Sequence, residues 1–206
     1  KLFLNWESRS KGTFTGLIIP NVFGPFGKPF YNSVVATFCH QITSNEAPII
    51  DVDTKLNLIY IGELVLEIIN VVNNKINQPL YLISHTKEIK VSEIYKLLKK
   101  YKNQYQDLGN IPEINSIFEL NLFNTFRSYI DIENYFPVKF TKHSDTRGSF
   151  VELIRTGIGG QVSFSTTEPG ITRGNHFHTR KIERFAVIKG KALIQLRKIG
   201  TNKVLE

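Results

Sequence analysis

Two imidazoles and one carboxylate lie close together near the end of the chain. His176 and His178 are separated by one residue, and Glu183 follows after four more. On an extended strand, residues two apart point to the same face, so both imidazoles can face the interior of a sheet, and Glu183 can return to the same point on the next strand. Two nitrogens and one oxygen suit a borderline divalent ion such as zinc, manganese, iron or nickel; we expect zinc.

The residues around these side chains make the pattern more specific. For His-x-His alone, two surface histidines on an edge strand are the favoured interpretation. Here Gly170 precedes His176 by six positions and Gly190 follows Glu183 by seven. The whole pattern resembles the first motif of the cupin superfamily. The resemblance implies a jelly-roll β-barrel in which His176, His178 and Glu183 are metal ligands. It also implies a fourth ligand from a second motif outside this chain, without which metal binding should be weak.

Two segments beside this motif resemble the signatures of dTDP-4-dehydrorhamnose 3,5-epimerases, namely 145–152 (DTRGSFVE) and 172–176 (TRGNH). The resemblance makes Arg147 and Arg173 candidates for binding a substrate diphosphate, which a planar guanidinium can bind with two hydrogen bonds. The alternative for Arg147 is a pair with Asp145 inside a turn. The motif histidine is a catalytic base in those epimerases, but an imidazole that binds a metal cannot accept a proton at the same nitrogen. We favour the ligand role for His176, which leaves the base unassigned.

A different family is indicated near the start of the chain. The segment 17–25 (LIIPNVFGP) resembles the one that follows the sixth strand in extended short-chain dehydrogenases. The resemblance implies that this segment passes beside a nicotinamide cofactor, which makes Pro20, Asn21 and Val22 the expected cofactor-binding residues. A plain strand–turn–helix unit is the alternative. The catalytic Tyr and Lys of this family and its Gly-rich phosphate loop are absent from the sequence, so we expect the catalytic residues of the reduction to lie outside the chain.

The same resemblance implies a substrate pocket. Residues 26–41 would line it, with Asn32 and Ser33 offering hydrogen bonds. A second segment, 58–64 (LIYIGEL), resembles a later element of these dehydrogenases, although Leu56 and Asn57 depart from the Arg-Asp pair that usually precedes it.

The elements that must position these residues fall into two parts. Strand-like runs alternate with helix-like ones up to about residue 130, which favours an α/β domain with a parallel sheet. The predicted strands are 16–20, 49–51, 56–61 and 79–84, with turn-rich residues at 21–25. The predicted helices are 31–43, an amphipathic helix over 62–73, one that Ser92 caps, and one over 115–128. The apolar stripe of the 62–73 helix is Ile61, Leu64, Val65, Ile68, Ile69 and Val72. The apolar stripe of the helix that Ser92 caps is Ile94, Leu97, Leu98 and Tyr101.

Short β-like runs separated by glycines follow after about residue 134, at 138–141, 150–154, 161–166, 183–188 and 192–196, which is typical of a sandwich or barrel. We therefore predict an α/β plus all-β chain. Residues 1–130 would be the C-terminal part of a Rossmann-like dehydrogenase domain, and residues 131–206 the first part of a cupin β-barrel.

Composition excludes several classes of protein. The chain has 206 residues with a net charge of +8, but its lysines are dispersed and lack interleaved aromatic residues, so no nucleic-acid partner is expected. No apolar run is long enough for a membrane helix. The one cysteine, Cys39, excludes an internal disulfide, and we expect a cytoplasmic protein. We also expect the chain to be part of a longer protein and inactive by itself.

Both halves together resemble the bifunctional capsular polysaccharide enzymes that make the precursor of UDP-N-acetyl-L-fucosamine. The resemblance is carried by residues 21–24 (NVFG), 29–40 (PFYNSVVATFCH) and 174–178 (GNHFH). It implies that the cupin domain epimerises a UDP-sugar at the carbon beside a 4-keto group, and that the dehydrogenase domain reduces the ketone with NADPH. A homodimer is expected. Two alternatives stay open: a non-catalytic cupin that binds or senses a sugar, and a nucleotide-sugar 3,5-epimerase that works without metal.

Overall fold

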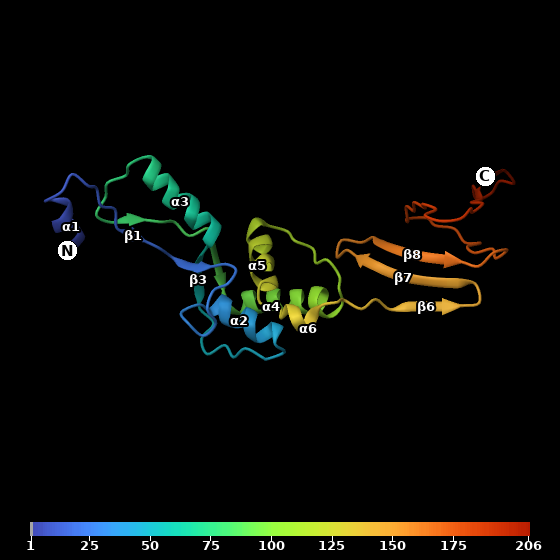
Figure 1. Cartoon of the computed structure of the whole chain (residues 1–206), viewed down its shortest axis with the longest axis horizontal. Coiled ribbons are helices and arrows are strands. Elements are labelled where there is room, and N and C mark those ends of the chain that lie inside the picture. The colour runs from blue at the N-terminus through green and yellow to red at the C-terminus, as the bar shows by residue number, and fades with distance from the viewer. Residues whose placement is uncertain (1) are drawn as a thin grey trace. The chain divides into compact units, whose positions relative to one another are not determined.

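The structure is a computed structural model that describes residues 2–206. The chain divides into two compact units, one comprising residues up to His143 with Phe150–Ser165, the other Ser144–Ser149 with Thr166–Glu206. Its elements in chain order (Figure 1) are α1 (Leu2–Glu7), β1 (Leu17–Ile18), β2 (Asn21–Phe23), α2 (Val34–Thr43), β3 (Lys55–Tyr60), α3 (Ile61–Asn73), β4 (Tyr81–Leu82), β5 (Lys87–Lys90), α4 (Val91–Tyr101), the π-helix η1 (Lys102–Asp107), α5 (Ile117–Arg127), α6 (Ile132–Tyr135), β6 (Lys142–Asp145), β7 (Gly148–Arg155), β8 (Gln161–Thr167), β9 (Leu196–Arg197) and β10 (Val204–Leu205).

The strands of the first unit form a mixed arrangement instead of the predicted parallel sheet. Strand β3 pairs in parallel with β2 and antiparallel with β5, while β1 and β4 form a separate parallel pair. The predicted turn at residues 21–25 is partly wrong, because Asn21–Phe23 forms β2. Its residues pair with Leu58, Ile59 and Tyr60, and this ladder outweighs the local turn preference of an Asn- and Gly-containing segment. No strand forms at residues 49–51.

The core of the first unit lies among helices α2, α4 and α5 and strand β3. The predicted stripe of α4 is confirmed, since Ile94, Leu98 and Tyr101 are fully buried and Leu97 is partly buried. The predicted N-cap is wrong: α4 begins at Val91, one residue before Ser92. The Ser92 backbone N–H and hydroxyl instead donate to the two carboxylate oxygens of Asp53, both at 2.9 Å.

Helix α3 agrees with the prediction in its bounds but not in its buried face. Leu64 and Val71 are buried, whereas Val65, Ile69 and Val72 are 45%, 48% and 67% exposed. Part of the apolar surface of α3 is therefore left exposed by the neighbouring strands of the described chain.

The last part of the chain contains an antiparallel sheet in the order β6-β7-β8 (Figure 1). Strands β7 and β8 confirm the predictions at 150–154 and 161–166. Residues 138–141 and 183–188 are not strands, and of residues 192–196 only Leu196 is in one. A strand needs a neighbour to satisfy its backbone groups, and the described residues offer these segments none. The architecture is mixed α/β with a C-terminal antiparallel sheet, and the domain boundary at residues 130 and 131 stays a prediction.

Among residues 2–206, the structure has no helix with both the length and the apolar character required to cross a membrane.

Candidate functional site

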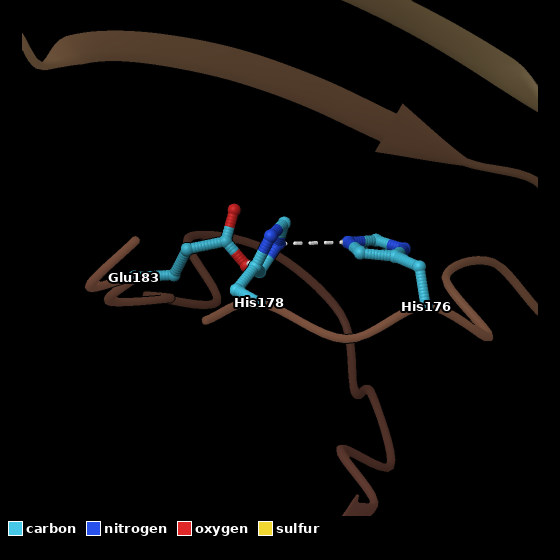
Figure 2. A group of neighbouring side chains, drawn as sticks. All are labelled: His176, His178 and Glu183. Carbon is cyan, nitrogen blue, oxygen red and sulfur yellow. Dashed lines mark hydrogen bonds and ion pairs between the residues drawn. The ribbon is translucent and has the colours of Figure 1, made fainter. Parts of the chain in front are cut away.

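The three predicted metal ligands lie together in the second unit (Figure 2). The Nε2 atoms of His176 and His178 are 3.0 Å apart, and His178 Nε2 lies 3.2 Å from Oε2 of Glu183. One ligand atom from each of the three residues lies within 4.8 Å of the others. The two imidazole rings are inclined at 72° with their centroids 4.6 Å apart. Two nitrogens and one oxygen therefore converge on one point.

The backbone brings these side chains together differently from the prediction. His176 and His178 lie in an irregular segment, not on a strand, and Glu183 is also outside any strand. The chain turns just before His176, where Gly174 has a φ of 100° and Asn175 a φ of 55°. Glycine has no Cβ to oppose this left-handed geometry, and asparagine tolerates it better than most residues. The turn and the one-residue spacing place both rings on one side of the segment.

The donor set fits a divalent ion. Zinc–nitrogen bonds of about 2.0–2.1 Å at tetrahedral angles place neighbouring donor atoms roughly 3.3 Å apart. The two shorter separations in the cluster, 3.0 and 3.2 Å, are close to that value. Binding through Nε2 would leave the imidazole proton of each histidine on Nδ1. The cluster is exposed, so an ion could reach it from solvent.

Lys181 contacts this cluster, although the sequence did not single out this residue. The Lys181 ammonium pairs with Oε1 of Glu183 and is the largest cause that lowers the pKa of this carboxyl below its usual range. Glu183 is therefore charged at neutral pH, as a metal ligand must be. Lys181 occupies Oε1, which leaves Oε2 beside His178 for the ion. The spacing of Lys181 and Glu183 offers no signal of this contact, because neither residue lies on a regular element.

The two predicted diphosphate-binding arginines are engaged to different extents. Arg147 makes the turn pair with Asp145: its Nε and Nη2 donate to Oδ2 at 2.9 and 2.6 Å, and its backbone N–H donates to Oδ1 at 2.8 Å. These hydrogen bonds are the largest cause that lowers the pKa of Asp145. Arg173 donates through Nη1 to the carbonyl oxygen of Thr166 at 2.9 Å. An anion would therefore compete with a carboxylate for Arg147, but only with a neutral carbonyl for Arg173.

A small cavity in the first unit brings together four of the predicted cofactor and substrate residues. Asn21 and Val22 of β2 line it together with Asn32 and Ser33, which precede α2. Pro20 does not line it. Ser33 also caps α2, where its Oγ accepts a hydrogen bond of 3.2 Å from the backbone N–H of Ala36. The cavity volume is about 80 Å³. Pockets that hold a whole ligand have volumes of about 300–1,000 Å³, so this cavity matches one group of a larger ligand.

The other residues that line this cavity are Val34 and Val35, which lie within the predicted pocket residues 26–41, and Leu56 and Leu58, which sequence reasoning did not place there. Two of them come from β3, which lies beside β2 only because the strands pair. Leu56 occupies a position where the dehydrogenases it resembles usually carry an arginine. Its apolar side chain forms part of the cavity wall, so this wall offers no cation to a phosphate.

Comparison with known proteins connects both halves of the chain to polysaccharide synthesis. Residues 143–206 match the family model of the polysaccharide biosynthesis C-terminal domain. Over 190 residues the chain is 36% identical to the UDP-2-acetamido-2,6-beta-L-arabino-hexul-4-ose reductase of Pseudomonas aeruginosa. That alignment covers 91% of this chain and 50% of the relative. The chain thus spans about half the length of this relative.

Two solved structures extend the comparison to the fold. The capsular polysaccharide assembling protein CapF of Staphylococcus aureus matches with a TM-score of 0.73 and 34% identity over 87% of this chain and 52% of that one. A UDP-N-acetylglucosamine 4-epimerase from Methanobrevibacter ruminantium shares the fold at a TM-score of 0.51 and 18% identity, over 63% of this chain and 50% of that one. The chain is therefore similar to CapF, a capsular polysaccharide assembling protein, and to a UDP-sugar 4-keto reductase, over about half the length of each.

Proposed function

We propose that this chain is part of a bifunctional UDP-sugar enzyme that epimerises C3 beside a 4-keto group and reduces the ketone at C4 with NADPH. The observation that carries the proposal is the similarity to a 4-keto-sugar reductase over 190 residues, which includes the cavity residues and the histidine pair. The product would be a precursor of N-acetyl-L-fucosamine for capsular polysaccharide. A homodimer remains the expected assembly.

In the reductase half, Asn21, Asn32 and Ser33 supply polar groups around the cavity, while Val22 and Leu58 supply apolar walls. This mixture suits recognition of one polar group of a UDP-sugar. NADPH would supply the hydride for the ketone. The chain's own residues bind and orient the substrate, which raises the rate by fixing the reacting carbon against the cofactor.

In the epimerase half, we propose that residues 131–206 are the first part of a metal-binding cupin barrel. His176, His178 and Glu183 would hold a divalent ion, with zinc expected. Such an ion supplies stabilisation for negative charge on the sugar carbonyl oxygen when the neighbouring proton is removed. The Arg173 guanidinium would bind the diphosphate, because its present partner is a neutral carbonyl oxygen.

The reductase assignment is tested with the full-length protein that contains this chain. Incubation with a UDP-4-keto-6-deoxy-N-acetylhexosamine should oxidise NADPH, which is followed by the loss of absorbance. An Asn32→Ala variant should raise KM for the UDP-sugar about tenfold, since one hydrogen bond to the substrate is lost. Asn45→Ala, at an exposed asparagine that does not line the cavity, is the control. Absence of NADPH oxidation with every UDP-4-keto sugar would overturn the assignment.

The metal assignment is tested separately by elemental analysis of the purified protein. His176→Ala should lower the bound zinc by at least about tenfold, because two protein ligands remain where three converge. His143→Ala removes an exposed histidine of β6 outside the cluster and should leave the zinc content unchanged. Equal zinc in the two variants would exclude His176 as a ligand.

A further inference from the structure

The irregular segment Gly24–Ser33 connects β2 to α2 and ends in two residues of the cavity wall, Asn32 and Ser33. Three of its non-glycine residues have left-handed backbone: Phe26, Phe30 and Asn32, with φ of 64°, 58° and 51°. This region is unfavourable for residues that carry a Cβ. Such a conformation persists only where surrounding contacts determine it. The position of the cavity wall therefore depends on what holds this segment.

Part of the support comes from the adjacent helix α2. The backbone N–H of Phe30 donates to Oγ1 of Thr37 at 2.9 Å, and Oγ1 of Thr37 donates to the carbonyl of Ser33 at 2.9 Å. The Phe30 ring also meets the His40 ring edge to face, with 5.7 Å between centroids. These contacts hold the end of the segment that is nearer to α2.

The other half is held by a residue that is distant in the sequence. Tyr129, two residues after the end of α5, donates from its hydroxyl to the carbonyl oxygen of Gly27 at 2.6 Å. The approach is close: a Cβ added at Gly27 would lie 3.1 Å from that hydroxyl and 3.4 Å from Cβ of Ala36. Burial raises the pKa of Tyr129 to about 12, so its hydroxyl is protonated and can donate at neutral pH.

We infer that Tyr129 is a positioning residue for the UDP-sugar pocket, because its hydroxyl holds Gly27 and thereby the segment that carries Asn32 and Ser33. Tyr129 is not among the residues that line the cavity, so it acts through the backbone of Gly24–Ser33. The inference rests on the proposed function, which assigns a UDP-sugar to this cavity.

The test compares two tyrosines in the full-length protein. Tyr129→Phe removes one hydroxyl and keeps the ring. Tyr135→Phe is the matched control, since its hydroxyl also donates to a backbone carbonyl, that of Tyr105 in η1, and its ring packs against the same core. We expect Tyr129→Phe to weaken the binding of UDP about five- to tenfold by calorimetry, the equivalent of one hydrogen bond. KM for the UDP-sugar should rise equally, with kcat unchanged. Tyr135→Phe should bind UDP within about twofold of the unmodified protein.

Gly27→Ala tests the same contact from the segment's side, and remains informative if Tyr129→Phe does not fold. The added Cβ pushes Gly27 away from the Tyr129 hydroxyl, and UDP affinity should fall to a similar extent. If both changes act through one contact, the double variant is no weaker than either single one. Failure of the unmodified protein to bind UDP contradicts the proposed function itself. Tight UDP binding by the unmodified protein and equally tight binding by Tyr129→Phe and Gly27→Ala overturns only the positioning role.

Discussion

At the scale of single residues, charge pairs decide which side chains of the second unit are available to a ligand. Arg147 and Asp145 satisfy one another, so this guanidinium is partly neutralised. Glu183 is shared between Lys181 and His178. An ion that binds Oε2 of Glu183 need not displace Lys181 from Oε1, and the lysine then keeps the carboxylate from binding through both oxygens. The residue types predicted which ligands each site could bind. These ion pairs determine which of its charged atoms are available to such a ligand.

The Arg147–Asp145 pair predicts how the stability of the protein depends on pH. The folded pKa of Asp145 lies below its ordinary value, so the pair stabilises the protein above about pH 4 and this contribution is lost as the pH falls through the lowered pKa. Arg147→Ala should raise the pKa of Asp145 toward the ordinary value, measured by carbon-13 NMR of the carboxyl group. Some lowering should remain, because the backbone N–H of residue 147 still donates to Asp145 and Arg173 also contributes. Arg180→Ala, an exposed arginine in the same unit, should leave this pKa unchanged, and an unchanged value in Arg147→Ala would contradict the pairing.

At the scale of elements, hydrogen bonds at the helix N-termini define where the helices of the first unit begin. Ser33 accepts from Ala36 at the start of α2, and Ser116 accepts from Glu119 at the start of α5. At the start of α4, Glu93 accepts from the backbone N–H of Lys90 at 3.0 Å. Each bond satisfies an amide that has no partner within the helix. The α2 cap has a further role, because Ser33 also lines the cavity.

The buried stripe of α4 predicts a large difference between two adjacent leucines. Leu98 is fully buried, whereas Leu97 is partly exposed. Leu98→Ala should lower the free energy of unfolding by about 2–5 kcal/mol, since it removes buried methyl groups and leaves a cavity. Leu97→Ala should cost clearly less. Urea denaturation of the two variants measures both values, and equal losses would mean that α4 packs through a different face.

At the scale of the whole molecule, part of the apolar surface is uncovered. On α3, Leu66 and Val72 are 68% and 67% exposed, and on β4 Leu82 is 71% exposed. A compact domain covers most side chains of this kind, and larger apolar patches mark surfaces that other polypeptide binds. The chain spans about half the length of its reductase relative.

The exposed face of α3 predicts that the isolated chain binds hydrophobic dyes and self-associates. Leu66→Lys should lower both, because it replaces an exposed apolar side chain by a charge. Asn70→Lys is the matched control, since it adds the same charge to the same helix at an exposed polar position. Fluorescence of a naphthalene-sulfonate dye and sedimentation velocity measure the two effects. Equal behaviour of both variants would show that α3 does not contribute the binding surface.

The sequence by itself determined the features that depend on neighbours along the chain. The spacing of Ile94, Leu98 and Tyr101 predicted the buried face of α4, because helical periodicity is a local property. The identity and spacing of two histidines and a glutamate likewise predicted three donor atoms within reach of one another. The three side chains lie together in the structure, although the strands expected to bring them together are absent from residues 170–190.

Tertiary structure alone decided which distant segments meet. Strand β2 exists because β3 pairs with it, so Leu58 reached the cavity wall without a signal in its own neighbourhood. Tyr129 contacts Gly27 across 102 positions of sequence. Contacts of this kind form only when the whole core of a unit assembles, since the entropy cost of closing such a long loop is offset by many contacts together. No local pattern of residue types encodes the combined effect of these contacts.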